Sequence, residues 1–190
     1  MMKIKALLFI IYVLSFTACN DYMPKPAGYP RIDRQRSEMQ TFDSSRFSFL
    51  YPASVEIREV KKEAQSGYWF NLVYTEFDAT IYCTYLPTNK TNLGQLLNES
   101  YHLAYSHASR ADGIEQVQFA DSLNHMCGII YDIKGAVASP IQFYLTDNTS
   151  NFLRGSLYFN QTVRADSIVP VVKFIREDIV GIMKTLKWKR

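Results

Sequence analysis

Runs of alternating apolar and polar residues recur along most of the chain and limit its fold more than any other feature. Successive side chains of a β-strand point to opposite faces, so each run predicts a strand with one buried face. The runs lie at residues 47–51, 55–60, 68–74, 79–86, 114–119, 126–133, 141–146 and 153–159. Short links between them, such as the turn-forming residues 147–151, predict hairpins and a mostly antiparallel sheet.

Two segments depart from the two-residue period. Apolar residues recur every three or four positions at residues 93–108 and again at 167–187, which predicts two helices with one apolar face each. Asn92 can cap the first helix, and Asp166 or Ser167 can cap the second. We therefore expect an α+β domain in which one inserted helix and one C-terminal helix pack on a mostly antiparallel β-sheet.

The first eighteen residues predict an export signal. Two lysines give a positively charged start, and the apolar run at residues 6–16 is too short for a bilayer, which needs roughly 20 residues. Thr17 and Ala18 then place two small residues before Cys19, as a lipoprotein signal peptidase requires. We expect cleavage before Cys19 and attachment of acyl chains such as palmitate there. A plain secretory signal, or an anchor with an incidental cysteine, is the alternative.

Cleavage at this point defines the predicted organisation of the chain. Residues 1–18 form the signal peptide, residues 19–41 form a lipidated cysteine with a proline-rich tether, and residues 42–190 form a single α+β domain. Loss of Lys3 and Lys5 lowers the net charge from +3 to +1. Nucleic-acid phosphates are held by Lys and Arg, so this balance predicts no nucleic-acid partner. The membrane is contacted through the lipid anchor.

Cys83 and Cys127 are the two cysteines that are not predicted to carry lipid. Both lie in apolar strand-like runs, where an unpaired cysteine packs as a small apolar side chain. The sequence therefore favours two buried thiols, although two cysteines in an oxidising compartment can also pair as a disulfide.

The sequence marks no catalytic centre. It contains no nucleophile-elbow motif and no glycine-rich nucleotide loop. His102 and His107 are five positions apart, which places them on different faces of a helix instead of the shared face that a metal pair uses. We therefore predict that the protein is not an enzyme and has neither a metal site nor a cofactor. A hydrolase would need a spatial cluster of Asp and Glu, or of Ser and His.

The tether contains the first of two segments whose composition suits binding. Stiff prolines are combined with an aromatic ring and two cations, at Pro24, Lys25, Pro26, Gly28, Tyr29, Pro30 and Arg31. These residues either dock along a groove of a partner protein or pack against the domain that follows them. The sequence favours neither interpretation.

The second segment is the predicted hairpin at residues 141–159. Gln142 shares one strand face with other polar residues, and Arg154 can form a bidentate pair with Asp147 across the loop. These three residues belong either to a recognition surface or to the interactions that fix the hairpin, and the second interpretation is favoured.

Several of these segments resemble the gliding motility lipoprotein family GldD of Bacteroidetes. The matching stretches are the cysteine at position 19, PKPAGYPRI in the tether, FSFLYP from Phe47, WFN from Trp69, SHASRADGI from Ser106, ASPIQFYLTD and NFLRGSLYFN in the hairpin, and the C-terminal DSIVPVVKFIREDI and TLKW. They follow one another over nearly the whole mature chain. The family pattern requires no cysteine at Cys83 or Cys127, so no family function is attached to them.

The resemblance implies a membrane lipoprotein of the cell envelope that faces the periplasm from either membrane. It implies a role in gliding motility and the associated type IX secretion machinery, as a non-catalytic assembly or stabilising component that binds envelope proteins of that apparatus. Asp121-Ser122-Leu123 is similar to a short O-glycosylation motif of Bacteroidetes, which makes Ser122 a candidate modification site. A weaker similarity to PsbP-like domains, in the FxFxYP opening and the closing helix, implies an α/β/α sandwich.

A second class of function is compatible with the same sequence. The aromatic content suits a small-ligand or glycan-binding envelope lipoprotein. Such a protein would have a large apolar concavity beside the helix at residues 93–108, whereas a solidly filled core would disfavour it.

Overall fold

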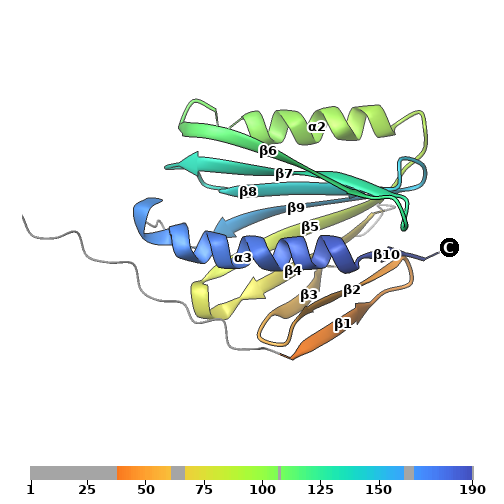
Figure 1. Ribbon diagram of the computed structural model, residues 1–190, viewed down its shortest axis with the longest axis horizontal. Coiled ribbons are helices and arrows are strands. Elements are labelled where there is room, and N and C mark those ends of the chain that lie inside the picture. The colour runs from red at the N-terminus through yellow and green to blue at the C-terminus, as the bar shows by residue number, and fades with distance from the viewer. Residues whose placement is uncertain (1–37, 61–66, 107, 161–164, 190) are drawn as a thin grey trace, which may run out of the picture.

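A sheet of seven strands forms the centre of the computed structural model, which describes residues 38–60, 67–106, 108–160 and 165–189 (Figure 1). The strand order is β3-β4-β5-β9-β8-β7-β6, and every neighbouring pair is antiparallel. The strands are β3 (Glu56–Val60), β4 (Tyr68–Tyr74), β5 (Ala79–Pro87), β6 (Ala111–Asp121), β7 (Met126–Gly135), β8 (Ile141–Thr146) and β9 (Asn151–Phe159). The mostly antiparallel sheet expected from the alternating runs is therefore confirmed.

A second, three-stranded sheet packs beside the first. It consists of β1 (Met39–Asp43), β2 (Phe47–Pro52) and β10 (Lys187–Trp188), with β2 in the middle. The sequence predicts β2 only. β1 lies where we expected the end of the tether, and its side chains are exposed except for the half-buried Phe42, so it lacks the alternation of a half-buried strand.

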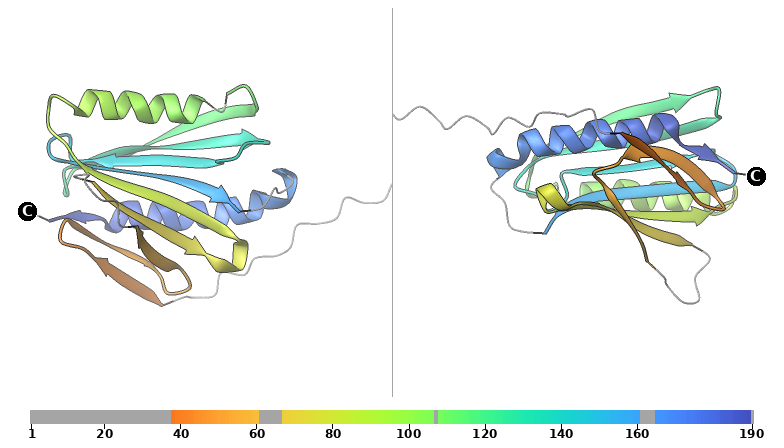
Figure 2. Two further views of the ribbon diagram at one scale, coloured as in Figure 1. Left: turned by 180° about the vertical axis from the view of Figure 1, so that it is seen from behind. Right: turned by 90° about the horizontal axis from the view of Figure 1, so that it is seen from below.

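The two long helices cover opposite faces of the seven-stranded sheet (Figure 2). α2 (Leu93–Tyr105) follows β5, and α3 (Ala165–Thr185) follows β9, while a short 3₁₀ helix η1 (Thr75–Phe77) joins β4 to β5. α3 and the small sheet share one face, and α2 packs on the other. This arrangement confirms the α+β class with two helices and gives three layers.

α2 begins at Leu93 with Asn92 in the N-cap position, as expected, but the capping interactions differ from those predicted. Asn89, not Asn92, caps the turn that leads into α2, because its side-chain oxygen accepts hydrogen bonds from the backbone N–H groups of Thr91 and Asn92 at 2.8 and 3.1 Å. Asn92 makes no side-chain cap bond to α2. α3 begins at Ala165, so Asp166 and Ser167 lie inside its first turn and neither is the N-cap residue.

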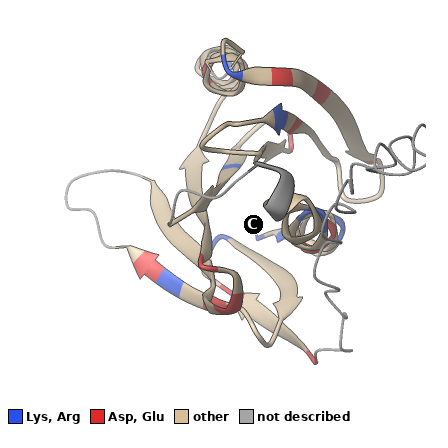
Figure 3. Cartoon of the chain, turned by 90° about the vertical axis from the view of Figure 1, so that its left-hand side faces the viewer, with Lys and Arg blue, Asp and Glu red and all other residues tan. Residues whose placement is uncertain are grey.

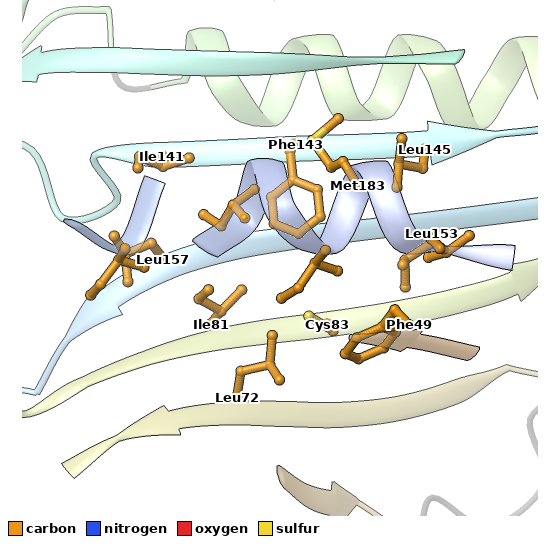
Figure 4. Packing of buried hydrophobic residues seen from close by; sticks show 14 of the residues in the cluster. Phe49, Leu72, Ile81, Cys83, Ile141, Phe143, Leu145, Leu153, Leu157 and Met183 are labelled. Atoms are coloured by element: carbon orange, nitrogen blue, oxygen red, sulfur yellow. The ribbon is translucent and has the colours of Figure 1, made fainter. Parts of the chain in front are cut away.

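The main core lies between the seven-stranded sheet, α3 and the small sheet (Figure 4). α3 contributes Ile175, Ile179, Ile182 and Met183, each at most 3% exposed. The sheet and β2 supply alternate residues of their strands, among them Phe49, Leu72, Ile81, Cys83, Ile141, Phe143, Leu145, Leu153 and Leu157. Burial of each large side chain contributes about 1.5–3 kcal/mol, so this layer holds the fold together.

Both remaining cysteines are unpaired, as the sequence favoured. Cys83 is buried in the main core, and burial raises the pKa of its thiol. Cys127 is only half-buried, and its sulfur accepts a contact from the Asn148 side-chain amide at 3.1 Å. Cys127 is paired with Thr146 across the strands, on the sheet face opposite to Cys83. The sheet therefore separates the two thiols.

None of the helices among the described residues has the length and apolar character needed to span a bilayer.

Candidate interaction surface

α2 covers only part of its sheet face. Ala104 of α2 packs with Tyr131 and Ile133 of β7, and the half-buried residues around them come from β6, β7, β8 and α2. The strands at the other end of the sheet, β3, β4, β5 and β9, extend beyond this helix (Figure 2). Their outward side chains therefore form a broad surface that no described element covers.

The strand register defines the residues of this surface. Side chains directly opposite each other in neighbouring strands share a face. Arg58, Asn71, Tyr82 and Ser156 form one such row across the four strands. We call the set the open sheet face, and it comprises Arg58, Val60, Trp69, Asn71, Tyr82, Thr84 and Tyr158, with Ser156 at its border beside α2.

Aromatic rings dominate the open sheet face. Tyr82 is 47% exposed and meets Tyr158 edge to face, with ring centroids 5.7 Å apart. The half-buried Trp69 ring lies along the sheet against Gly67, where an added Cβ would come within 2.6 Å of the indole. Tyr and Trp are enriched at protein interfaces, since they bring large contact area with a polar tip. These rings were not among the residues predicted to form a site, although the alternation in residues 68–74 and 79–86 places Trp69 and Tyr82 on one face.

The charges on and beside this face are paired. The guanidinium of Arg58 donates to Glu56 at 2.6 and 2.8 Å, and this hydrogen bond lowers the pKa of Glu56. At the border with α2, Arg154 of β9 lies 3.9 Å from Glu99. The open sheet face is therefore nearly neutral, and aromatic, hydroxyl and amide groups dominate its chemistry.

The structure separates the three predicted hairpin residues. Gln142 is 6% exposed beneath α2, and its side-chain amide donates to the backbone carbonyl of Leu103 at 3.5 Å. The predicted pair between Arg154 and Asp147 is wrong, because Arg154 faces α2 and pairs with Glu99. Gln142 thus links β8 to α2, and only Arg154 borders the open sheet face.

Asp147 organises the turn between β8 and β9. One carboxylate oxygen accepts hydrogen bonds from the backbone N–H groups of Thr149, Ser150 and Asn151 at 2.8–2.9 Å. The other accepts from the Asn151 side-chain amide at 2.6 Å. Burial alone would raise the pKa of Asp147, but these hydrogen bonds together lower it below its ordinary value.

Replacing Asp147 by Ala is expected to lower the free energy of unfolding by about 1–2 kcal/mol at pH 7, because three backbone donors lose their acceptor. The carboxylate has a lower pKa in the folded chain, so its contribution is complete above the unfolded value of about 3.9 and is lost as the pH falls through the folded value. Urea unfolding at pH 7 and pH 3 measures this difference.

Asp121→Ala is the matched control for that experiment. Asp121 accepts backbone hydrogen bonds from Leu123 and Asn124 in the exposed turn between β6 and β7. Water can replace the lost acceptor there, so a smaller loss is expected. A loss for Asp147→Ala that is the same at both pH values would contradict the assigned role.

The other predicted site residues lie at the surface or outside the described residues. Ser122 is exposed in the turn between β6 and β7, and its glycosylation stays a prediction. Cys19 and the tether residues Pro24–Arg31 precede the described part of the chain. His102 is exposed on α2, and His125 occupies the same turn as Ser122 with a φ of 50°. Over the described ranges, no group of three metal-ligating side chains comes together.

The cavities differ from the expectation for a ligand-binding protein. Beside α2, between Ser100, Leu103, Tyr131 and Gln142, the described residues leave a space of about 10 Å³. A larger cavity of about 410 Å³ lies at the other helix, between the first half of α3, strands β6 and β7, and Pro140 in the link to β8. Among the described residues, this space beside α2 is therefore far smaller than the apolar concavity expected of a ligand-binding protein there.

One protein-family model matches most of this chain. The sequence model described as gliding motility lipoprotein GldD matches residues 19–188, from the predicted lipidation site to the end of β10. The chain belongs to the GldD family. Membership makes it a lipoprotein of the cell envelope, anchored to a membrane and associated with the motility machinery.

Comparison with solved structures finds a likeness to cyanobacterial PsbP (CyanoP) from Synechocystis sp. PCC 6803. The two chains are 11% identical and superpose with a TM-score of 0.49, over 86% of this GldD chain and 99% of the other. No curated protein sequence matches the chain.

Proposed function

We propose that this GldD protein is a non-catalytic assembly or stabilising component of the gliding apparatus and its associated type IX secretion machinery. It faces the periplasm and binds envelope proteins of that apparatus through the open sheet face. Family membership supports the role in motility. The observation that carries the binding surface is the uncovered half of the sheet, with Trp69, Tyr82 and Tyr158 on it.

The composition of this face fits a protein partner. Residues that dominate binding energy at interfaces are mostly Trp, Tyr and Arg in a patch depleted of unpaired charge. The open sheet face offers the first two, with Arg58 and Arg154 already paired at its borders. Because the rings project from strands and not from loops, they are held rigidly and lose little conformational entropy on binding.

The lipid anchor restricts where such a partner is found. The predicted tether spans residues 19–41, but residues 39–41 belong to β1, so residues 19–38 let the domain reach at most about 60 Å from the membrane, at roughly 3 Å per residue. A partner of the open sheet face is therefore a membrane protein or a protein held close to the membrane. The segment Pro24–Arg31 is a second contact in this proposal, nearer to the bilayer.

Site-specific crosslinking in gliding cells tests the surface. A photoreactive amino acid in place of Tyr82 is expected to trap motility or secretion proteins, identified by mass spectrometry. The control carries the same amino acid in place of Tyr101, which is 42% exposed on α2 and stacks on Tyr105, away from the open sheet face. Equal products from both positions, or background proteins alone, would contradict the proposal.

Removing the rings of Tyr82 and Tyr158 tests whether the open sheet face is needed for gliding. The double variant Tyr82→Ser, Tyr158→Ser is expected to weaken partner binding by roughly tenfold or more and to slow gliding, since each interface aromatic contributes on the order of 1 kcal/mol or more. The single variant Tyr101→Ser is expected to glide normally. Thermal unfolding of the purified variants checks that the effect does not come from a loss of stability.

A further inference from the structure

The cavity beside α3 is closed on one side by the helix and on the other by the sheet. Its volume of about 410 Å³ falls in the range of small-molecule sites. Pro140 at the start of β8 and Ile168, Val169 and Val172 on α3 supply its apolar walls. None of the described residues that line it is aromatic, so these walls offer aliphatic contact and no ring on which a flat ligand could stack.

Arg176 is a cation of the cavity that one hydrogen-bonded group holds in place, while its other N–H groups can donate to a ligand. The Arg176 Nε group donates to both carboxylate oxygens of Asp132, at 2.8 and 3.0 Å. No described residue accepts a hydrogen bond from the two Nη groups of Arg176. A guanidinium that is anchored through Nε and has free Nη groups is suited to bind a second carboxylate. Asp132 therefore acts as a positioning residue for Arg176.

A second cation lies on the same side of α3. Lys173 is exposed, lines the cavity and precedes Arg176 by three positions, so the two side chains share one helix face. On the opposite wall, Lys134 lies 3.4 Å from Glu115. The lining thus contains three cations and two carboxylates. Both carboxylates already face a cation, and the unmatched charge at the cavity is positive.

We propose that this cavity binds an aliphatic carboxylate, with its hydrocarbon part among Pro140, Ile168 and Val172 and its carboxylate on Arg176 and Lys173. The volume accommodates on the order of twelve non-hydrogen atoms, at roughly 30 Å³ each. A medium-chain fatty acid and a peptide that ends in an aliphatic residue share this chemistry. The site lies across the sheet from the open sheet face and does not depend on the proposed docking there.

Calorimetric titration of the full lipidated protein in phosphatidylcholine nanodiscs tests the site. Sodium octanoate is expected to bind saturably, one per chain, after subtraction of the heat from empty nanodiscs. Octylammonium, which has the same chain and the opposite charge, is expected to bind at least tenfold more weakly. Comparison of octanoate with acetyl-Ala-Val-Leu and its amide distinguishes a fatty acid from a peptide carboxylate, and preference for either acid supports the shared chemistry.

Matched lysine variants locate the binding. Lys173→Gln is expected to weaken octanoate binding roughly tenfold, the effect of losing one charge-assisted contact. Lys184→Gln removes the same charge from the last turn of α3, outside the cavity, and is expected to change binding less than twofold. Both lysines are exposed, so neither change endangers folding.

A third variant tests the apolar walls. Val169 is 53% exposed at the cavity, and Val169→Trp is expected to fill part of the space and to abolish octanoate binding. Three results would each overturn the proposal. The two lysine variants could bind octanoate equally well, octylammonium could bind as tightly as octanoate, or the heat could match that of empty nanodiscs.

Discussion

A Cys19→Ala variant is expected to lose acylation, to keep its signal peptide and to stop cells from gliding. The lipoprotein signal peptidase cuts before a cysteine whose sulfur carries lipid, so without this thiol the chain is neither modified nor released from residues 1–18. Each buried CH₂ of an acyl chain contributes about 0.8 kcal/mol to membrane binding, and several chains together give a stable anchor. Alanine removes the entire lipid attachment, which makes this the largest functional effect expected of a single substitution.

Intact-mass analysis, metabolic labelling with palmitate and gliding on agar measure the three consequences. Cys127→Ala is the control, because it removes a half-buried, unpaired thiol elsewhere in the chain. This control should be acylated, cleaved and active. If the Cys19→Ala chain were cleaved, located and active like the unaltered protein, the lipid anchor and every conclusion about location would be wrong.

The largest effect on stability is expected from Gly128→Ala in β7. Gly128 is paired with Leu145 of β8, and an added Cβ would clash with the backbone carbonyl oxygen of Tyr144 and come within 2.9 Å of the Leu145 side chain. A backbone oxygen of a central strand cannot rotate away, so β7 and β8 must move apart. We expect the free energy of unfolding to fall by roughly 3–5 kcal/mol, a large share of the 5–15 kcal/mol typical of a domain.

Gly181→Ala is the control variant, because it adds a Cβ at a glycine where no clash is expected. Gly181 lies within α3 and has no atom within 4 Å of the position that a Cβ would take. Alanine there removes the entropic cost of a helical glycine and is expected to stabilise the protein by about 0.5–1 kcal/mol. Urea unfolding followed by circular dichroism compares the two. Similar effects of both changes would show that β7 and β8 pack more loosely than the structure indicates.

Most elements could be predicted from the sequence because one face of each is buried, which gives its apolar residues a regular spacing. The eight alternating runs correspond to β2 through β9, and the two helical runs correspond to α2 and α3 within a few residues at each end. β1 and β10 could not be predicted in this way. β10 has two residues, and β1 is an exposed edge strand, so their pairing with β2 follows from tertiary contacts alone.

The candidate sites were harder to predict, because they arise from how elements meet. The alternation shows that Trp69 and Tyr82 share a face, but only the placement of α2 over β7 and β8 shows that this face stays uncovered. The cavity cation Arg176 and its partner Asp132 are 44 positions apart in the chain. Gln142 was expected to belong either to a recognition surface or to the interactions that fix the hairpin, whereas its amide makes a buried contact with Leu103 of α2.

The position of β1 determines which contacts of the domain break first under a mechanical force. The predicted lipid anchor at Cys19 precedes β1, and β1 pairs with β2 alone, from Met39 opposite Pro52 to Asp43 opposite Ser48. Under a force between the membrane and a partner on the open sheet face, the hydrogen bond from the Ala53 N–H to the Glu38 carbonyl is therefore expected to break first. The successive residue pairs between β1 and β2 follow. Peeling this outer strand would lengthen the tether by several residues before α3 or the central sheet came apart.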